Sequence, residues 1–292
     1  MKTALSFDDV LLVPKYSEID TRSKITLSQE VKYVGHIRLP IISSPMDTVT
    51  EASMALKMHQ MGAFGIIHRY NTIQQQAELA REVVDQAGDC GAAIGINDDF
   101  LERAIALTNA GVGMICIDVA HGHHYKVRYA LEALRNTLGT SVHIMAGNVA
   151  TLQGFNDLAD WGADSIRIGI GGGSICSTRI QTGHGMPTLQ SVMDCAQSDR
   201  DALLIADGGI RTSGDIVKAL AAGADFVMLG SLLAGTEETP GKCFQSTSGE
   251  RRKVYRGMAS PDAQHMWRKK VSSVEGISSS VPYKGSVSDT VK

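Results

Sequence analysis

The chain of 292 residues is 43% hydrophobic and 20% charged, and its formal net charge is only −3. This composition is that of a globular protein, and the near balance of charges gives no indication of a nucleic acid or an anionic membrane as partner. No apolar run reaches the roughly 18 residues of a membrane span. The N-terminal segment MKTALSFDDVLLVPKY lacks the long apolar block of a signal peptide, and the five scattered cysteines predict a reduced, cytoplasmic protein.

Short apolar segments, most of them rich in β-branched residues, recur along the chain. They cover residues 39–45, 64–68, 90–95, 114–119, 143–147, 165–170, 203–208 and 226–231. Continuously apolar segments of this length are typical of strands in a parallel sheet that is buried on both faces. Amphipathic patterns typical of helices lie between them, and many end at glycine, as helix C-caps do. These patterns cover residues 51–62, 72–86, 100–111, 125–139, 151–162 and 212–223.

The alternation of strands and helices predicts an α/β fold, a (β/α)8 TIM barrel that takes up residues 1–292 as a single domain. A doubly wound open sheet is the structural alternative. That fold would carry a Gly-x-Gly-x-x-Gly turn after its first strand and an acidic partner for a ribose, and the sequence has neither. Residues 236–292 are polar and interspersed with glycine and serine, so we expect loops there, with an active-site flap over residues 236–280.

Polar residues and glycines follow the ends of several predicted strands, and in a barrel these ends surround the active site. They are Asp118, His121, Asn148, Cys176, Thr178, Asp207, Gly208, Gly209, Gly230 and Ser231. Each of them could also belong to an ordinary turn or helix cap. Their common place at one rim of the barrel favours a functional site.

The segment GIGGGSICSTR, Gly169–Arg179, sets a cysteine beside three consecutive glycines. Glycine lets a ligand approach the backbone closely, and a thiol there is a candidate nucleophile, although an isolated cysteine is more often a buried structural residue. The Gly-Gly and Gly-Ser pairs after the last two strands are typical of a phosphate site, to which Ser174 adds a hydroxyl. Since Asp207 is placed to accept hydrogen bonds from a sugar, the pattern indicates a nucleotide.

Several segments together resemble the IMP dehydrogenase and GMP reductase family, nearly from end to end and in order. They are LSFDDVLLVPKYSE, SSPMDTVTEA, GIIHR, DVAHGH, MAGNVAT, GIGGGSICSTR, ADGGIRTSGDI, VMLGSLLAGTEETPG, YRGM and EGISSSVPYKG. The family consists of (β/α)8 barrels that act on purine nucleotides, so the resemblance implies an NAD(P)-dependent oxidoreductase. Because family members are tetramers, it also implies a homotetramer.

Carried over to this chain, the resemblance implies that Cys176 attacks C2 of the purine to form a covalent adduct, with Thr178 and Glu275 as a proton-handling pair. The residues implied for the substrate are Ser174, Gly209, Gly230, Ser231 and Tyr255 for the phosphate, Asp207 for the ribose, and Met46, Gly257 and Met258 for the base. Those implied for the nicotinamide cofactor are Asp118, Asn148 and His121. A monovalent cation, K+, is implied at Gly171, Gly173 and Cys176.

Two branches of the family are open to this chain. A GMP reductase converts GMP to IMP and ammonia with NADPH, whereas an IMP dehydrogenase converts IMP to XMP with NAD and needs a mobile flap that carries an Arg-Tyr pair. Between Gly257 and Val281 the chain has no such pair, since Arg268 is followed by Lys, and no regulatory module is inserted between 64–68 and 90–95. Both features favour the reductase, although DVAHGHH and GTEETPG resemble the dehydrogenase as much. A third hypothesis is a nucleotide-binding homologue without turnover.

The cysteine loop departs from the family pattern at two positions, of which Ser177 in place of a common threonine is the milder change. Gly172 stands where the family usually has proline. Because proline restricts both its own backbone and that of the preceding residue, we expect a looser loop in this chain.

Overall fold

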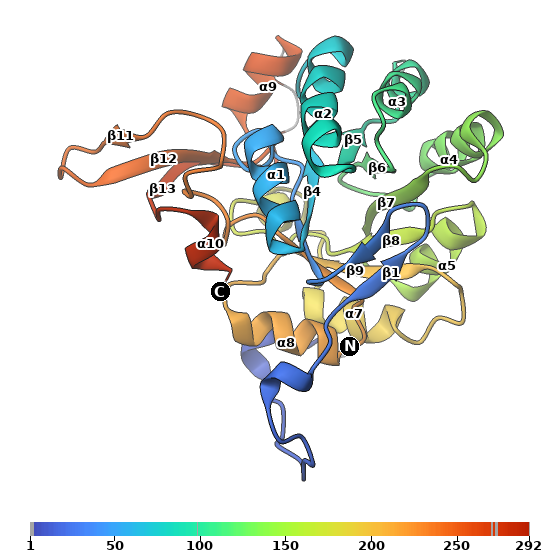
Figure 1. The fold of residues 1–292 in the computed structure, drawn as a ribbon, viewed down its shortest axis with the longest axis vertical. Helices are drawn as coiled ribbons and strands as arrows, with labels where there is room; N and C mark the ends of the chain where they lie inside the picture. Colours follow the sequence, from blue (N-terminus) through green and yellow to red (C-terminus); the bar gives the residue numbers. More distant parts are fainter. Residues whose placement is uncertain (1–2, 98, 270, 272–273, 292) are drawn as a thin grey trace.

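The structure is a computed structural model, which describes residues 3–97, 99–269, 271 and 274–291. Its centre is a closed barrel of parallel strands in the order β10-β3-β4-β5-β6-β7-β8-β9 (Figure 1). The barrel closes where Val227 of the last strand pairs with Ile41 of the first. The strands are β3 (Ile41–Ser43), β4 (Phe64–Ile67), β5 (Gly91–Ile94), β6 (Met114–Asp118), β7 (His143–Val149), β8 (Ser165–Ile168), β9 (Leu203–Asp207) and β10 (Phe226–Leu229). The predicted TIM barrel is confirmed, and every barrel strand overlaps a predicted segment.

Helices on the outside of the barrel connect the strands, and most of them match a predicted pattern. The matching helices are α1 (Ala52–Met61), α2 (Ile73–Ala87), α3 (Phe100–Asn109), α4 (Tyr125–Leu138), α5 (Leu152–Asp160) and α8 (Ser213–Ala221). Thr72 begins α2 with a capping box, in which its side chain and that of Gln75 each accept the other residue's backbone N–H. Gly88 ends α2 in the left-handed conformation. This helix alone links β4 to β5, as the absence of an inserted module predicts.

The long connection between β8 and β9 holds two helices that the sequence patterns did not indicate. They are α6 (Thr178–Thr182) and α7 (Thr188–Cys195). α7 covers the barrel with Leu189, Val192 and Cys195, which are all buried. Because both helices are short and follow a glycine-rich loop, a helical period is hard to read in this part of the sequence.

The side chains of each strand alternate between the barrel interior and the layer under the helices, as the two-residue period of a strand requires. On β6, Met114 and Cys116 belong to the interior cluster, whereas Ile115 and Ile117 pack in the layer shared with the helices. The interior cluster also contains Ile42, Phe64, Ile66, Ala93, Met145, Ile205, Phe226 and Met228. Cys116, in the middle of β6, is fully buried.

A short hairpin caps the N-terminal end of the barrel. Its strands β1 (Gln29–Val31) and β2 (Gly35–Ile37) pair in antiparallel fashion. Val31 and Ile37 join the interior cluster, so the hairpin closes the barrel at the end where the strands begin. None of the helices in the described part of the chain has both the length and the apolar character that a membrane crossing requires.

The residues before this hairpin form an arm that projects from the barrel (Figure 1, blue). The 3₁₀ turn η1 (Phe7–Asp9) anchors it through the buried ring of Phe7, and a second turn, η2 (Arg22–Lys24), lies near its end. Between the turns the arm exposes large apolar side chains, among them Leu11, Val13 and Tyr16.

The C-terminal residues contain more regular structure than we expected. The described part of 236–292 forms an antiparallel sheet and two helices, which are β11 (Phe244–Gln245), β12 (Arg251–Arg256), β13 (Ser278–Pro282), α9 (Pro261–Arg268) and α10 (Val287–Thr290). Lys253 and Tyr255, two residues apart on β12, are both buried. The polar composition of β12 made this strand hard to predict, because a lysine is normally exposed. Here the ammonium group of Lys253 is buried and donates hydrogen bonds to the carbonyl oxygens of residues 236, 237 and 239. Residues 270, 272 and 273 of the predicted flap lie outside the described part.

Candidate active site

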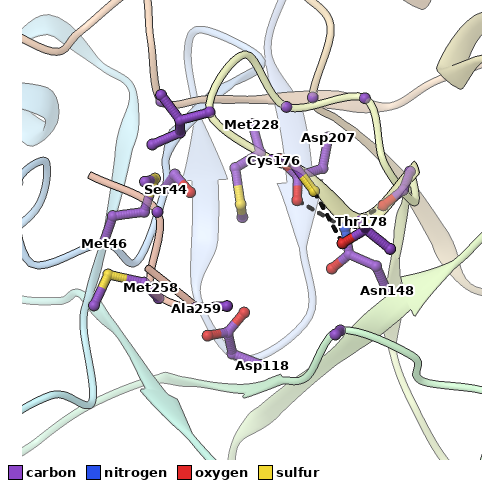
Figure 2. A pocket seen from close by; sticks show the side chains of 18 of the residues that line it. Ser44, Met46, Asp118, Asn148, Cys176, Thr178, Asp207, Met228, Met258 and Ala259 are labelled. Carbon is purple, nitrogen blue, oxygen red and sulfur yellow. Dashed lines mark hydrogen bonds between the residues drawn. The ribbon is translucent and has the colours of Figure 1, made fainter. Parts of the chain in front are cut away.

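A cavity of about 540 Å³ opens at the C-terminal ends of the barrel strands. Its floor continues the alternation of the strands, because the next inward position of four strands carries a polar side chain (Figure 2). These side chains belong to Ser44, Asp118, Arg167 and Asp207. The two-residue alternation that points apolar side chains into the barrel interior therefore also points these polar side chains into the cavity at its C-terminal end.

The loop after β8 carries Cys176 to the cavity and is fastened there by the C-terminal segment. The N–H of Ser177 donates to the carbonyl oxygen of Glu275 over 3.0 Å, and the N–H of Ile277 donates to that of Ile175 over 3.1 Å. These bonds pair two segments that lie far apart in the sequence. As a result, the side chain of Glu275 lies beside the cysteine loop.

Glycines let this loop pass close to its neighbours. At Gly169, whose φ is +144°, a Cβ atom would lie 1.9 Å from the carbonyl oxygen of Asp207. At Gly172, where the family usually has proline, a Cβ atom would lie 2.5 Å from Oγ1 of the buried Thr188. Gly172 thus allows a close approach between the loop and α7, and a proline there would require the Thr188 side chain to move. Whether the loop is also looser stays a prediction.

Cys176, Thr178 and Glu275 form a continuous series of hydrogen bonds on the cavity wall. Sγ of Cys176 donates to Oγ1 of Thr178 over 3.2 Å, and that hydroxyl donates to Oε2 of Glu275 over 2.8 Å. Figure 2 shows the first of these contacts. Because the Thr178 hydroxyl accepts from the thiol and donates to the carboxylate, the series can pass a proton between Cys176 and Glu275.

On the cavity floor, Arg167 joins two carboxylates. Its Nη1 donates to Oδ1 of Asp118 over 2.6 Å, and its Nη2 donates to Oδ2 of Asp207 over 2.9 Å. Nδ2 of Asn148 donates to the same oxygen of Asp207 over 2.8 Å. Burial opposes the positive charge of Arg167, but Asp207 and Asp118 outweigh burial and raise its pKa well above the ordinary value.

Arg167, which we did not single out in the sequence, holds two predicted site residues, Asp118 and Asp207. A third, Asn148, joins them through its bond to Asp207. A signal was present, since Arg167 is the only charged residue in the apolar segment 165–170. A charge in a buried strand needs a partner. A search for such residues would therefore have found it.

Another part of the cavity is lined by glycine backbone and hydroxyl groups. Gly209 follows β9 with a φ of +79°, and Gly230 and Ser231 follow β10. Tyr255 comes from β12, and a Cβ atom at Gly230 would lie 3.2 Å from its phenolic oxygen. Burial raises the pKa of Tyr255 to about 12, against the opposing effect of a hydrogen bond with Ser174. The phenol therefore keeps its proton at neutral pH and can donate to an anion.

Thioether groups line a further part of the cavity. Sδ of Met258 accepts a hydrogen bond from the backbone N–H of Asp47 over 3.4 Å, so Met258 lies beside the loop that carries Met46. Gly257 also lines the cavity, and Met228 of β10 adds a thioether that the sequence analysis did not assign (Figure 2). Polarisable sulfur atoms suit contact with an aromatic ring.

His121 is the one predicted site residue that does not line the cavity. Its side chain is exposed, and its ring meets that of His123 edge-on, with the centroids 6.4 Å apart. Partial burial and the charges of neighbouring histidines lower its pKa. A role in cofactor binding therefore stays a prediction for His121. Gly171 and Gly173, which we predicted as cation ligands, do line the cavity.

Comparison with known proteins agrees with this architecture. Residues 4–292 match the family model described as IMP dehydrogenase / GMP reductase domain. The chain is similar to inosine-5'-monophosphate dehydrogenase of Nitrosopumilus maritimus, at 34% identity over 100% of this chain and 90% of that protein. The corresponding enzyme of Cryptosporidium parvum is 36% identical over 98% and 84%, and GMP reductase of Leishmania major is 30% identical over 99% and 88%. The chain therefore belongs to the IMP dehydrogenase / GMP reductase family of NAD(P)-dependent oxidoreductases, as its motifs predicted.

Proposed function

We propose that this protein is a GMP reductase, which converts GMP to IMP and ammonia with NADPH through a covalent adduct between Cys176 and C2 of the purine. The observation that carries the proposal is the hydrogen-bonded series of Cys176, Thr178 and Glu275 on the cavity wall. It provides a nucleophile and, next to it, a hydroxyl and a carboxylate that can give and take protons.

In the first half of the reaction, the sulfur of Cys176 bonds to C2 of GMP, and the bond between C2 and the exocyclic amine breaks. The thiol loses its proton through Thr178 to Glu275, which turns the sulfur into the stronger nucleophile, the thiolate. The same pair returns a proton to the departing amine, which leaves as ammonia. The proton lost by the thiol is the one gained by the amine, so the step balances.

The other lining residues suit a nucleoside monophosphate. Tyr255 and Ser174 can donate to a phosphate beside the backbone of Gly209 and Gly230. Arg167 and Asn148 both bond to Oδ2 of Asp207, which orients the carboxylate and leaves Oδ1 to accept from a ribose hydroxyl. These contacts support a mononucleotide as substrate.

A nicotinamide cofactor would supply the electrons that reduce C2 and release Cys176. The lining residues fit the carboxamide of such a ring. Nε of Arg69 is buried without a hydrogen-bond partner in the described part of the chain, 3.7 Å from Oδ2 of Asp118. Together with the side-chain amide of Asn148, these groups would hold the carboxamide by its oxygen and nitrogen.

IMP dehydrogenase, which converts IMP to XMP with NAD, is the second candidate, because most of the compared relatives carry that name. The sequence between Gly257 and Val281 favours the reductase, since it contains no Arg-Tyr pair to activate water. Potassium at Gly171, Gly173 and Cys176, and a cytoplasmic location, belong to the same proposal and await their own tests.

A paired assay tests the branch. The purified protein is incubated with GMP and NADPH, and separately with IMP and NAD, while the absorbance of the reduced nicotinamide is followed. We expect NADPH to be consumed only with GMP, and Cys176→Ser to abolish turnover without abolishing GMP binding. Formation of NADH with IMP would instead establish the dehydrogenase. Tight nucleotide binding without turnover in either mixture would point to a binding protein.

A further inference from the structure

Two separate parts of the segment that covers the cavity meet at one buried carboxylate. We call residues 256–267, from the end of β12 to the last turn of α9, the covering segment. Within it, Gly257, Met258 and Ala259 line the cavity. The carboxylate belongs to Asp47, which follows Met46 in the loop between β3 and α1.

Asp47 holds the beginning of the covering segment through Arg256. Nε and Nη2 of Arg256 lie 3.1 Å and 2.5 Å from Oδ2 of Asp47. The Asp47 side chain is only 2% exposed, so water screens this ion pair weakly. The backbone N–H of Asp47 also donates to Sδ of Met258, as described above.

Asp47 holds the end of the covering segment through Trp267. The indole Nε1 donates to Oδ2 of Asp47 over 2.7 Å. The indole ring also packs at 6.2 Å from the ring of His68, which is 1% exposed. His68 is itself fixed, since Nε2 bonds to Glu51 and Nδ1 accepts from the N–H of Tyr70. α9 is thereby attached to the ends of two barrel strands.

We propose that Asp47 is a positioning residue, which holds the covering segment closed through Arg256 and Trp267 and so sets Met46 and Met258 at the distance that the purine requires. The proposal rests on the proposed function for the nature of the base. One carboxylate serves both ends of the segment, so the closed arrangement depends on both contacts. Trp267 is the contact that can be removed singly, because the indole has only one polar group.

The test compares Trp267→Phe with Trp161→Phe, a matched change at the chain's other tryptophan, which lies at the end of α5 and does not line the cavity. Iodoacetamide labels the folded proteins, and peptide mass spectrometry follows each cysteine. The half-buried Cys243 is the internal reference, and labelling of the buried Cys90 or Cys195 would reveal unfolding.

We expect Trp267→Phe to label Cys176 about tenfold faster than wild type, as the loss of one hydrogen bond to a charged group implies, while labelling of Cys243 is unchanged. Its KM for GMP should rise more than its kcat falls. Asp47→Asn, which removes the charge at constant volume, should act in the same direction. Labelling of Cys176 at the wild-type rate in either folded variant would overturn the proposal. Because labelling needs no turnover, this result is independent of whether the enzyme reduces GMP.

Discussion

The polar floor of the cavity depends on one arginine in an apolar strand. Arg167 is 5% exposed, yet its charge is stable there because Asp118 and Asp207 each accept a hydrogen bond from one of its guanidinium nitrogens. Removal of either carboxylate would leave the buried charge of Arg167 with one partner instead of two. The arrangement fixes Asp207, and with it the place where we expect the ribose.

Substitution of a single residue, Glu275, tests whether the series Cys176, Thr178 and Glu275 acts as a proton relay. Glu275→Gln keeps the volume of the side chain but removes the charge that accepts the proton of Thr178. We expect kcat to fall by roughly 10²- to 10⁴-fold, the usual contribution of a positioned acid or base, with little change in KM for GMP. Steady-state kinetics measure both constants.

The control for this variant is Glu250→Gln, which alters an exposed carboxylate in the turn between β11 and β12. It should keep the activity of the wild type. A Glu275→Gln enzyme that retained the wild-type kcat would exclude the relay.

At the level of elements, three aspartates support the beginnings of barrel strands. Each precedes one strand and accepts a backbone N–H at the start of a neighbouring strand. Asp89 accepts from Gly113 over 2.8 Å, whereas Asp164 and Asp225 accept from Ile144 and Leu204 over 2.7 Å. Among the three, Asp164 also forms an ion pair with Arg135, which neutralises its charge.

Burial raises the pKa of Asp89 from 3.8 to about 6, although backbone N–H groups of Gly113 and Cys90 favour its ionised form. The protonated carboxyl therefore contributes stability below about pH 4, and this contribution is lost as the pH rises through about 6. Asp89→Asn cannot ionise and keeps an acceptor for Gly113. We expect it to be more stable than wild type at neutral pH by about 1 to 3 kcal/mol, as a higher Tm in calorimetry, with the difference vanishing near pH 4.

Asp164→Asn is the matched control for this effect. It makes the same chemical change at an equivalent place, but it deprives Arg135 of its ion-pair partner. We expect a lower Tm at neutral pH for this variant. Equal shifts of the two variants would show that burial of the charge does not govern the effect.

At the scale of the whole molecule, the arm near the N-terminus exposes apolar surface that a monomer would leave in water. Leu11 is 86% exposed and Val13 is 80% exposed. We expect the protein to be a tetramer whose subunits cover these side chains. In light scattering after gel filtration, the double variant Leu11→Asp, Val13→Asp should form smaller species. Val217→Asp, a change at an exposed position on α8, should leave the tetramer intact, and a monomeric wild type would contradict the expectation.

The local sequence was sufficient to predict the eight barrel strands, most of the helices between them, the TIM barrel and the place of the cysteine loop. Strand period, helix caps and the backbone freedom of glycine are properties of residues close together in the chain, so they can be read locally. Even there, β12 escaped prediction, because its buried Lys253 looks like a surface residue until its carbonyl partners are known.

Which polar groups meet one another depends on the folded structure. Glu275 reaches Thr178 because the residues around it pair with the cysteine loop. Arg167 reaches two carboxylates because the barrel brings together strands that are separate in sequence. Asp47 accepts hydrogen bonds from Arg256 and Trp267, which lie at opposite ends of the covering segment. The physical reason is common to all three cases. Charges and hydrogen-bond donors pair with groups that are close in space, and the periodicity of neighbouring residues contains no information about which distant segments will be close.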